Sequence, residues 1–500
     1  MKQKEFASKK PSQLIAILPL AFFSTMATST FAAPDNDNDN DNNEENKPFL
    51  TAPLLLKDMG SFYIGGVAKT TDFASTPTPN VNNEPNLASQ YWVARENQIV
   101  IGQMYVQFLI PASANKNSIP VINVHGSTHT GAALESTPDG REGWGPYMAR
   151  HGIPTYIVDQ PGRGRSGFDE SVVHEAESLI DSSPAEAKTL LPTISRITSN
   201  GAWTAWFGHI FTDSSCSNPG TSFANGRSIY NSTLYQHGEL SCDNGNTAGG
   251  FHTPGMAYLP AFPINAIDPG ITNLGNMPPN LAPLAPFADA HLGAPTYGPD
   301  AYYQLQYYKQ LVPNMEATLP SSICNSCTFD PVGGQTSTFN ATRLAPANTW
   351  SPFDLALLVE KLGSGIIATH SQSGIQGHHA VRNLKERGSL SKLKALVTIE
   401  GGCSFNNSGL TAADFDNVEY LAIVGDYTAE SATCIDSVAK INARRAQGLG
   451  TAKAEYIKLD SAQINSDGRF NGTTHMMMLG TNNLKVADII LKWTKKYVKK

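Results

Sequence analysis

The sequence predicts an α/β fold in which a mostly parallel central sheet carries helices on both faces. Short apolar runs rich in β-branched residues alternate along the chain with segments of helical periodicity. Continuous apolar runs of this kind are typical of parallel strands that are buried on both faces. Gly and Pro number only 42 and 32 among 500 residues, too few for a low-complexity chain. The chain can therefore bury a sizeable core.

The charge balance excludes one class of partner. The chain has 36 Lys and Arg against 43 Asp and Glu, a formal net charge of -7, so we expect no nucleic-acid partner. Charged residues make up 16% of the chain, against roughly 25% in an average soluble protein. Asn, Ser, Thr and Gly make up the difference, and this composition favours an exported protein.

Residues 1–32 have the order of a secretory signal peptide. Lysines among the first ten residues precede an apolar stretch over residues 14–23, and we expect cleavage after Ala32. The stretch is shorter than the roughly 20 residues that span a bilayer, so we expect no membrane span in the mature protein. Residues 33–50 contain an Asp/Asn run that predicts a disordered spacer. Together these features predict a secreted or periplasmic protein.

The chain contains six cysteines, an even set that favours disulfides in an exported protein. Several pairings are formally possible. We expect Cys403 with Cys434, Cys216 with Cys242, and Cys324 with Cys327. The last pair forms a Cys-x-x-Cys sequence, which is also typical of redox motifs, but an oxidising compartment favours a disulfide.

The core of the fold is predicted in two parts, residues 51–171 and 351–500. In the first part we expect two leading antiparallel strands at 61–64 and 99–110 and two parallel strands at 119–124 and 154–158. A helix is expected at 144–150, between the two parallel strands. In the second part we expect strands at 365–369, 396–399, 419–424 and 454–459. Helices are expected there at 374–386, 436–447 and 483–496.

Residues 172–350 interrupt this alternation and predict an inserted cap. Gly, Pro, Asn and aromatic residues accumulate there without clear periodicity. Disordered segments are poor in aromatic residues, so we expect the insertion to be folded. Trp203, Trp206 and Phe207 could form an apolar wall for a substrate, or they could be the core of the cap itself.

A nucleophile is predicted at Ser371, which follows the buried strand at 365–369 and precedes a helix. This arrangement is typical of the nucleophile elbow, a strained turn that exposes a serine hydroxyl and needs small residues two positions before and after it. Thr369 and Ser373 occupy those positions, where Gly is usual. We expect the backbone N–H groups of Ser127 and Gln372 to form an oxyanion hole, because the flexible Gly126 after a buried strand lets the N–H of Ser127 turn towards the site and Gln372 directly follows the nucleophile.

A serine nucleophile needs a base and an acid that orients the base. His475 follows the last strand and can reach the carboxyl edge of the sheet, so we expect it to be the base. Glu400 ends one strand and Asp426 ends the next, and both remain candidates for the acid.

Several of these segments resemble a branch of bacterial α/β-hydrolase esterases that carries a twin cysteine beside its oxyanion hole. The similar segments lie at 125–131, 135–144, 159–166, 202–203, 308–313, 369–374 and 471–483. The resemblance implies an α/β-hydrolase fold with its nucleophile, acid and base at Ser371, Glu400 and His475, and it implies cysteines that match Cys403 and Cys434. Ser127 and Thr128 replace the twin cysteine here.

The combined expectation is an exported carboxylic ester hydrolase that acts through a Ser-His-Glu triad and an acyl-enzyme intermediate. Its substrate would be a small-molecule or polymeric ester, and we expect neither a cofactor nor a metal. An amidase or a peptidase could use the same triad. A protein of this fold could also bind ligands without catalysis, because the fold does not guarantee the reaction.

Overall fold

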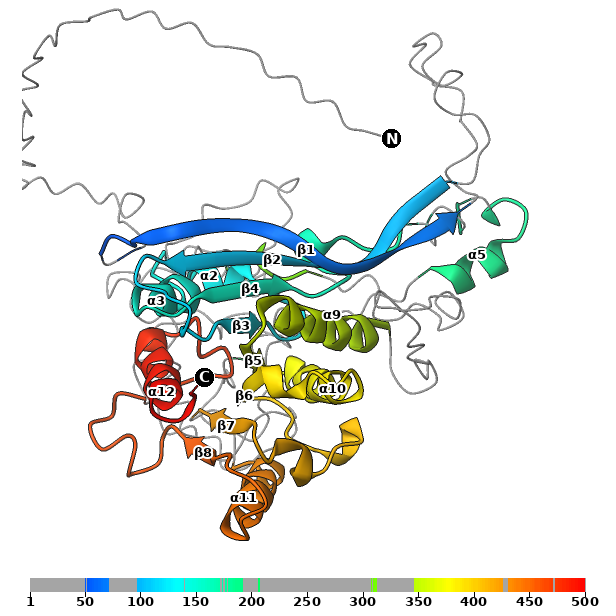
Figure 1. Ribbon diagram of the computed structural model, residues 1–500. Helices are drawn as coiled ribbons and strands as arrows, with labels where there is room; N and C mark the ends of the chain where they lie inside the picture. Colours follow the sequence, from blue (N-terminus) through cyan, green and yellow to red (C-terminus); the bar gives the residue numbers. More distant parts are fainter. Residues whose placement is uncertain are drawn as a thin grey trace, which may run out of the picture. The chain divides into compact units, whose positions relative to one another are not determined.

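The computed structural model (Figure 1) describes one compact unit within residues 48–500. The described residues are 50, 52–71, 97–138, 140–170, 173, 176, 177, 179–191, 206, 307, 309–312, 346–425, 430–470 and 473–499. Several predictions therefore concern residues outside the described part: the signal peptide, most of the spacer, Asp426, Trp203, Phe207, and the cysteines at 216, 242, 324 and 327.

The described strands form one eight-stranded sheet in the order β1-β2-β4-β3-β5-β6-β7-β8. They are β1 (Leu56–Thr71), β2 (Asn97–Pro111), β3 (Val121–Val124), β4 (Thr155–Asp159), β5 (Gly365–His370), β6 (Leu393–Ile399), β7 (Glu419–Val424) and β8 (Ala454–Lys458). The pairs β1–β2 and β2–β4 are antiparallel, and every later pair is parallel. The predicted mostly parallel sheet is confirmed.

Strand β1 is much longer than the four residues expected at 61–64. It pairs with β2 along almost its whole length, from Leu56 to Thr71. Gly65 and Gly66 lie within it at φ angles of 66° and 77°. These glycines interrupt the alternation of side chains that identifies a strand in a sequence, so only the segment before them was expected to be a strand.

Helices cover both faces of the sheet, as Figure 1 shows: α3 and α12 lie on one side, and α9, α10 and α11 lie on the other. The described helices are α2 (Ala132–Glu135), α3 (Trp144–Arg150), α5 (Pro184–Leu190), α9 (Pro346–Leu362), α10 (Ser373–Glu386), α11 (Ala432–Ala446) and α12 (Asn483–Tyr497). Neighbouring residues of β5 enter opposite cores: Ile366 packs with α3 and α12, whereas Ile367 packs with α9 and α10. This alternation is the reason why the central strands are apolar throughout.

Helix α9 was not expected from the sequence. Pro352 lies inside it, and proline normally breaks a helix because it lacks an N–H donor and clashes with the preceding turn. The helix persists because its apolar side, including Leu355, Leu358 and Val359, is completely buried. Tertiary packing therefore outweighs the local preference here.

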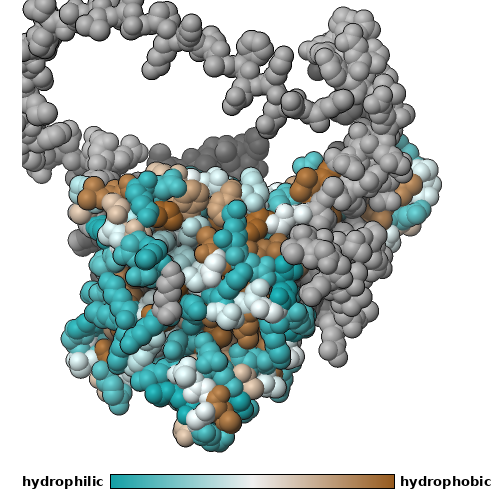
Figure 2. Space-filling view, in the orientation of Figure 1, coloured by the Kyte–Doolittle hydropathy of each residue, from teal (hydrophilic) through white to brown (hydrophobic). Residues whose placement is uncertain are grey.

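The surface in Figure 2 is mostly hydrophilic, with hydrophobic residues gathered over β1 and β2. Leu55, Met59 and Val100 are among the exposed apolar side chains in this region. None of the described helices has the length and apolar character needed to cross a bilayer.

Candidate active site

Ser371 occupies a strained turn between β5 and α10. Its φ angle is 55°, in the left-handed region that residues other than Gly rarely adopt. Two backbone hydrogen bonds hold the turn: Ser371 N–H donates to Ile399 O at 2.9 Å, and Gly374 N–H donates to Ser371 O at 2.9 Å. Strain of this kind persists only where the surrounding structure enforces it, and it is concentrated at functional sites.

The residues that replace the usual glycines of the elbow are both buried and hydrogen-bonded. Thr369 Oγ1 donates to Val397 O at 3.1 Å, and Ser373 Oγ accepts the His370 N–H at 2.8 Å. Gly377 leaves room for the larger threonine, since a Cβ there would come within 2.9 Å of Thr369 Cγ2. The departure from the usual motif is thus accommodated by a glycine on the next turn of the helix.

The structure brings Ser371, His475 and Glu400 together in one hydrogen-bonded series. His475 Nε2 lies 2.8 Å from Ser371 Oγ, and His475 Nδ1 lies 3.1 Å from Glu400 Oε2. Only 5% of the His475 side chain and 1% of the Glu400 side chain are exposed. In the tautomer in which Nδ1 donates to this carboxylate, Nε2 can accept a hydrogen bond from the Ser371 hydroxyl.

Hydrogen bonds to β7 and to the residue directly after it hold Glu400 in place. It adopts a φ angle of 51° directly after β6, and its N–H donates to Ile423 O at 2.8 Å. Its second carboxylate oxygen, Oε1, accepts the N–H of Gly425. A Cβ at Gly425 would lie 2.8 Å from Thr473 O, so a glycine is needed for this close approach.

Two contacts that the sequence did not reveal support His475. Its backbone N–H donates to the carbonyl of Trp206 at 3.1 Å. The ring of His370 lies 4.8 Å from the His475 ring, and its Nε2 donates to His475 O at 2.8 Å. Burial, followed by the proximity of His475, lowers the pKa of His370 well below its usual value, which keeps it neutral.

The loop that carries Ser127 is held through its carbonyl groups. Ser127 O accepts from Thr128 Oγ1 and from His129 Nδ1, both at 2.6 Å. Thr128 adopts a φ angle of 60°, and its carbonyl accepts the N–H of Val312 at 2.8 Å. Hydrogen bonds thus restrain this segment.

Two described residues of the insertion pack beside this loop. The ring of Trp206 meets His129 edge to face at 5.4 Å, and Tyr307 Oη lies 3.2 Å from His129 Nε2. Trp206 and Tyr307 are also buried members of the core that contains α3 and α12. Trp206 therefore belongs to a packed core of the main fold and also contacts the loop that carries Ser127.

Histidines around the site are held neutral by burial. Desolvation, with a smaller contribution from the charge of Arg163, lowers the pKa of His125 to about 3. Desolvation also lowers the pKa of His129 to about 4. Among the described residues, no group of three or more His, Cys, Asp or Glu side chains could hold a metal ion.

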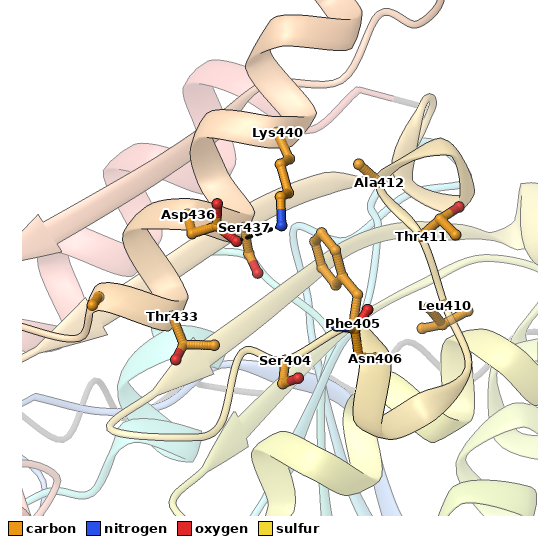
Figure 3. Close-up of a pocket in the computed structure, with 11 residues that line it drawn as sticks. Ser404, Phe405, Asn406, Leu410, Thr411, Ala412, Thr433, Asp436, Ser437 and Lys440 are labelled. Atoms are coloured by element: carbon orange, nitrogen blue, oxygen red, sulfur yellow. Dashed lines mark ion pairs between the residues drawn. The ribbon is translucent and has the colours of Figure 1, made fainter.

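The predicted disulfide between Cys403 and Cys434 is confirmed, and it connects the loop after β6 to the first turn of α11. Beside it lies a pocket of about 530 Å³, whose lining includes Phe405, Lys440 and Asp436 but none of Ser371, Glu400 and His475. Figure 3 shows an ion pair between Lys440 and Asp436 at this pocket.

The fold is that of an α/β-hydrolase, and a comparison with solved structures supports this. The chain is similar to a solved structure described as "The Atomic Resolution Structure of a Novel Bacterial Esterase", with a TM-score of 0.53 and 22% sequence identity. The match covers 90% of this chain and 99% of that chain. The predicted fold class is therefore confirmed.

The sequence comparisons cover a much smaller part of the chain. No protein-family model matches the chain. A 63-residue segment is 38% identical to a protein named "Probable secreted lipase phiG" from Fungal sp. (strain ATCC 74256). That segment represents 13% of this chain and 17% of the lipase.

Proposed function

We propose that the protein is an exported serine carboxylic ester hydrolase with Ser371 as nucleophile, His475 as base and Glu400 as the orienting acid. The observation that carries the proposal is the series of hydrogen bonds from Ser371 Oγ through His475 to Glu400. A serine hydroxyl is a weak nucleophile until a positioned base accepts its proton. The strained φ angle of Ser371 adds support, because it is the conformation that exposes an elbow serine.

In the proposed reaction, His475 Nε2 removes the proton of Ser371 Oγ as this oxygen bonds to the ester carbonyl carbon. Glu400 stabilises the imidazolium that forms. The backbone N–H groups of Ser127 and Gln372 hold the negative oxygen of the tetrahedral intermediate. His475 then gives the proton to the leaving alkoxide, and an acyl-enzyme remains. In the second half of the reaction, His475 removes a proton from a water molecule as its oxygen bonds to the acyl carbon. His475 then returns the proton to Ser371 Oγ, and the carboxylic acid is released.

The names of similar proteins support the substrate class and the destination. The similar solved structure is described as that of an esterase, and the matching segment belongs to a protein named a secreted lipase. The disulfide between Cys403 and Cys434 is the kind of bond that persists in an oxidising compartment. We therefore extend the proposal to a secreted or periplasmic enzyme that needs no cofactor, with residues 1–32 removed on export.

The test is intact-mass labelling of the mature protein with a fluorophosphonate, which phosphonylates only an activated serine. We expect one adduct in the wild type and none in Ser371→Ala, which should remain folded. Ser404→Ala, a serine at the pocket beside the disulfide, is the matched control and should label like the wild type. An unlabelled wild type would reject the proposal and favour a binding protein without catalysis.

Relative rates on matched substrates then separate an esterase from an amidase or a peptidase. The pair should share one acyl group and differ only in an ester or an amide bond. We expect the ester to be hydrolysed at least ~100-fold faster per labelled site, because the serine must expel a much poorer leaving group from the amide. Comparable rates on both substrates would overturn the esterase assignment while leaving the proposed triad intact.

A further inference from the structure

Arg163 is a buried cation between the proposed oxyanion loop and the elbow. It lies just after β4, and only 3% of the residue is exposed. One guanidinium nitrogen, Nη1, donates to the carbonyl oxygen of Gly126 at 2.8 Å. The other, Nη2, donates to the side-chain Oε1 of Gln372 at 2.8 Å. A single side chain therefore connects the segment before Ser127 to the residue directly after Ser371.

The first of these bonds acts on a peptide group that the proposed mechanism uses. The Gly126 carbonyl and the Ser127 N–H belong to the same planar, trans peptide, so they point in opposite directions. A donor that holds the carbonyl on one side directs the N–H to the other side. His125 Nδ1 lies 2.8 Å from the same carbonyl, which restrains the peptide further.

We propose that Arg163 is a positioning residue that joins the two halves of the oxyanion hole: it directs the N–H of Ser127 and restrains Gln372, the residue that carries the second N–H donor. The inference rests on the proposed function. Its basis is the pair of hydrogen bonds from one guanidinium to Gly126 and Gln372. Only an arginine presents two donors in a rigid planar fork, so a lysine at this position keeps the charge and loses one of the two contacts.

The charge of Arg163 adds to this geometric role. Both described acceptors of its Nη groups are uncharged oxygen atoms, a backbone carbonyl and a side-chain amide. The neighbouring His125 and His129 are neutral near pH 7, because burial lowers their pKa values to about 3 and about 4. A buried positive charge beside the site favours a transition state in which negative charge develops on the substrate oxygen.

Arg165 provides a matched control from the same turn. Its guanidinium forms ion pairs with Asp159 at 2.8 Å and Glu135 at 2.8 Å, and it lies 4.3 Å from the centre of the Tyr105 ring. It has no described contact with Gly126 or Gln372. Replacing it should therefore affect stability without a specific effect on the reaction.

The experiment is a double-mutant cycle with Arg163→Lys, Gln372→Leu and the double variant, in which kcat and KM are measured per site titrated with fluorophosphonate. Titration removes the effect of any unfolded fraction from kcat. We expect Arg163→Lys to lower kcat by ~10²-fold, the range seen when one oxyanion donor is lost, with KM changed less than about threefold. The double variant should lose no more than ~3-fold beyond Arg163→Lys, because the two residues act as one unit. Arg165→Lys should keep kcat per site.

A second measurement covers the case in which the lysine variant does not fold. Arg163→Ala leaves space for a free guanidinium ion, and ~20 mM guanidinium should raise its kcat per site at least ~5-fold, whereas equimolar urea should not. The inference is overturned if Arg163→Lys keeps kcat within twofold, or if guanidinium and urea act alike on Arg163→Ala. A wild type that neither labels nor hydrolyses esters would instead reject the proposed function.

Discussion

Glu400 Oε2 lies 3.1 Å from Nδ1 of His475, and both side chains are almost completely buried. The other carboxylate oxygen of Glu400 is occupied by the N–H of Gly425. Both oxygens of this carboxylate therefore accept hydrogen bonds from fixed donors. In the proposed triad, a carboxylate held in this way keeps the imidazole in the tautomer that directs Nε2 towards Ser371.

Replacing Glu400 with Gln should therefore lower kcat by ~10³- to 10⁴-fold, because an amide cannot stabilise the imidazolium and can favour the wrong tautomer. The rate of ester hydrolysis per folded protein is the measurement. Asp426→Asn is the control, since Asp426 was the other candidate for the acid from the sequence. We expect it to retain kcat within threefold. A severe loss in Asp426→Asn with little loss in Glu400→Gln would reassign the acid.

Gly126 should not tolerate a side chain. A Cβ there would lie 2.8 Å from His370 Nδ1 and 2.9 Å from Ser371 Cβ, closer than real Cβ contacts. Gly126→Ala must shift the elbow or the loop before Ser127, so we expect at least a ~10-fold loss of kcat per folded molecule. Gly365→Ala is the control at the start of β5, where the added Cβ meets Ile122 and Val359 at an ordinary 3.5 Å. Equal activity of the two variants would contradict this prediction.

The protein should lose stability as the pH falls below about 6.5. Burial lowers the pKa of His378 to about 4 from 6.5. Between these values the unfolded chain binds a proton at this residue and the folded chain does not, so stability that is present above pH 6.5 is lost as the pH falls towards 4. At ~1.4 kcal/mol per pH unit, His378 alone lowers the free energy of unfolding by ~2 kcal/mol at pH 5 relative to neutral pH.

Urea unfolding at pH 7.5 and pH 5 measures this effect. The difference in free energy between the two pH values should shrink by ~2 kcal/mol in His378→Gln, because glutamine does not titrate. His151→Gln, at an exposed histidine, should keep the full difference. An unchanged difference in His378→Gln would show that this histidine does not carry the acid sensitivity.

The disulfide should contribute to stability more than to catalysis. It joins residues 31 positions apart, and closing a loop of that length stabilises the folded state by roughly 3 to 4 kcal/mol in the chain-entropy model. We expect Cys403→Ala with Cys434→Ala to lower the free energy of unfolding by ~2 to 4 kcal/mol. At temperatures below unfolding, kcat per titrated site should stay within about twofold. An unchanged melting temperature would refute the stability prediction.

Local patterns in the sequence were enough to predict the alternation of strands and helices and the turn at Ser371 between a buried strand and a helix. The strand over Glu419–Val424 and the helix over Trp144–Arg150 have the expected bounds. Both follow from local periodicity, which depends on neighbours in the chain. The helix at Pro346–Leu362 was not predicted from the sequence, because Pro352 disfavours a helix locally and only burial in the folded protein stabilises it.

Which side chains meet at the elbow depends on the tertiary structure. Ser371 and His475 are 104 residues apart, and the sheet order brings them to one edge. The contact of Glu400 with His475, the support of His475 by His370, and the bridge formed by Arg163 also join separate strands and loops. Local patterns carry no information about such contacts, because hydrogen bonds between distant residues form only when packing of the sheet and its helices has fixed their positions.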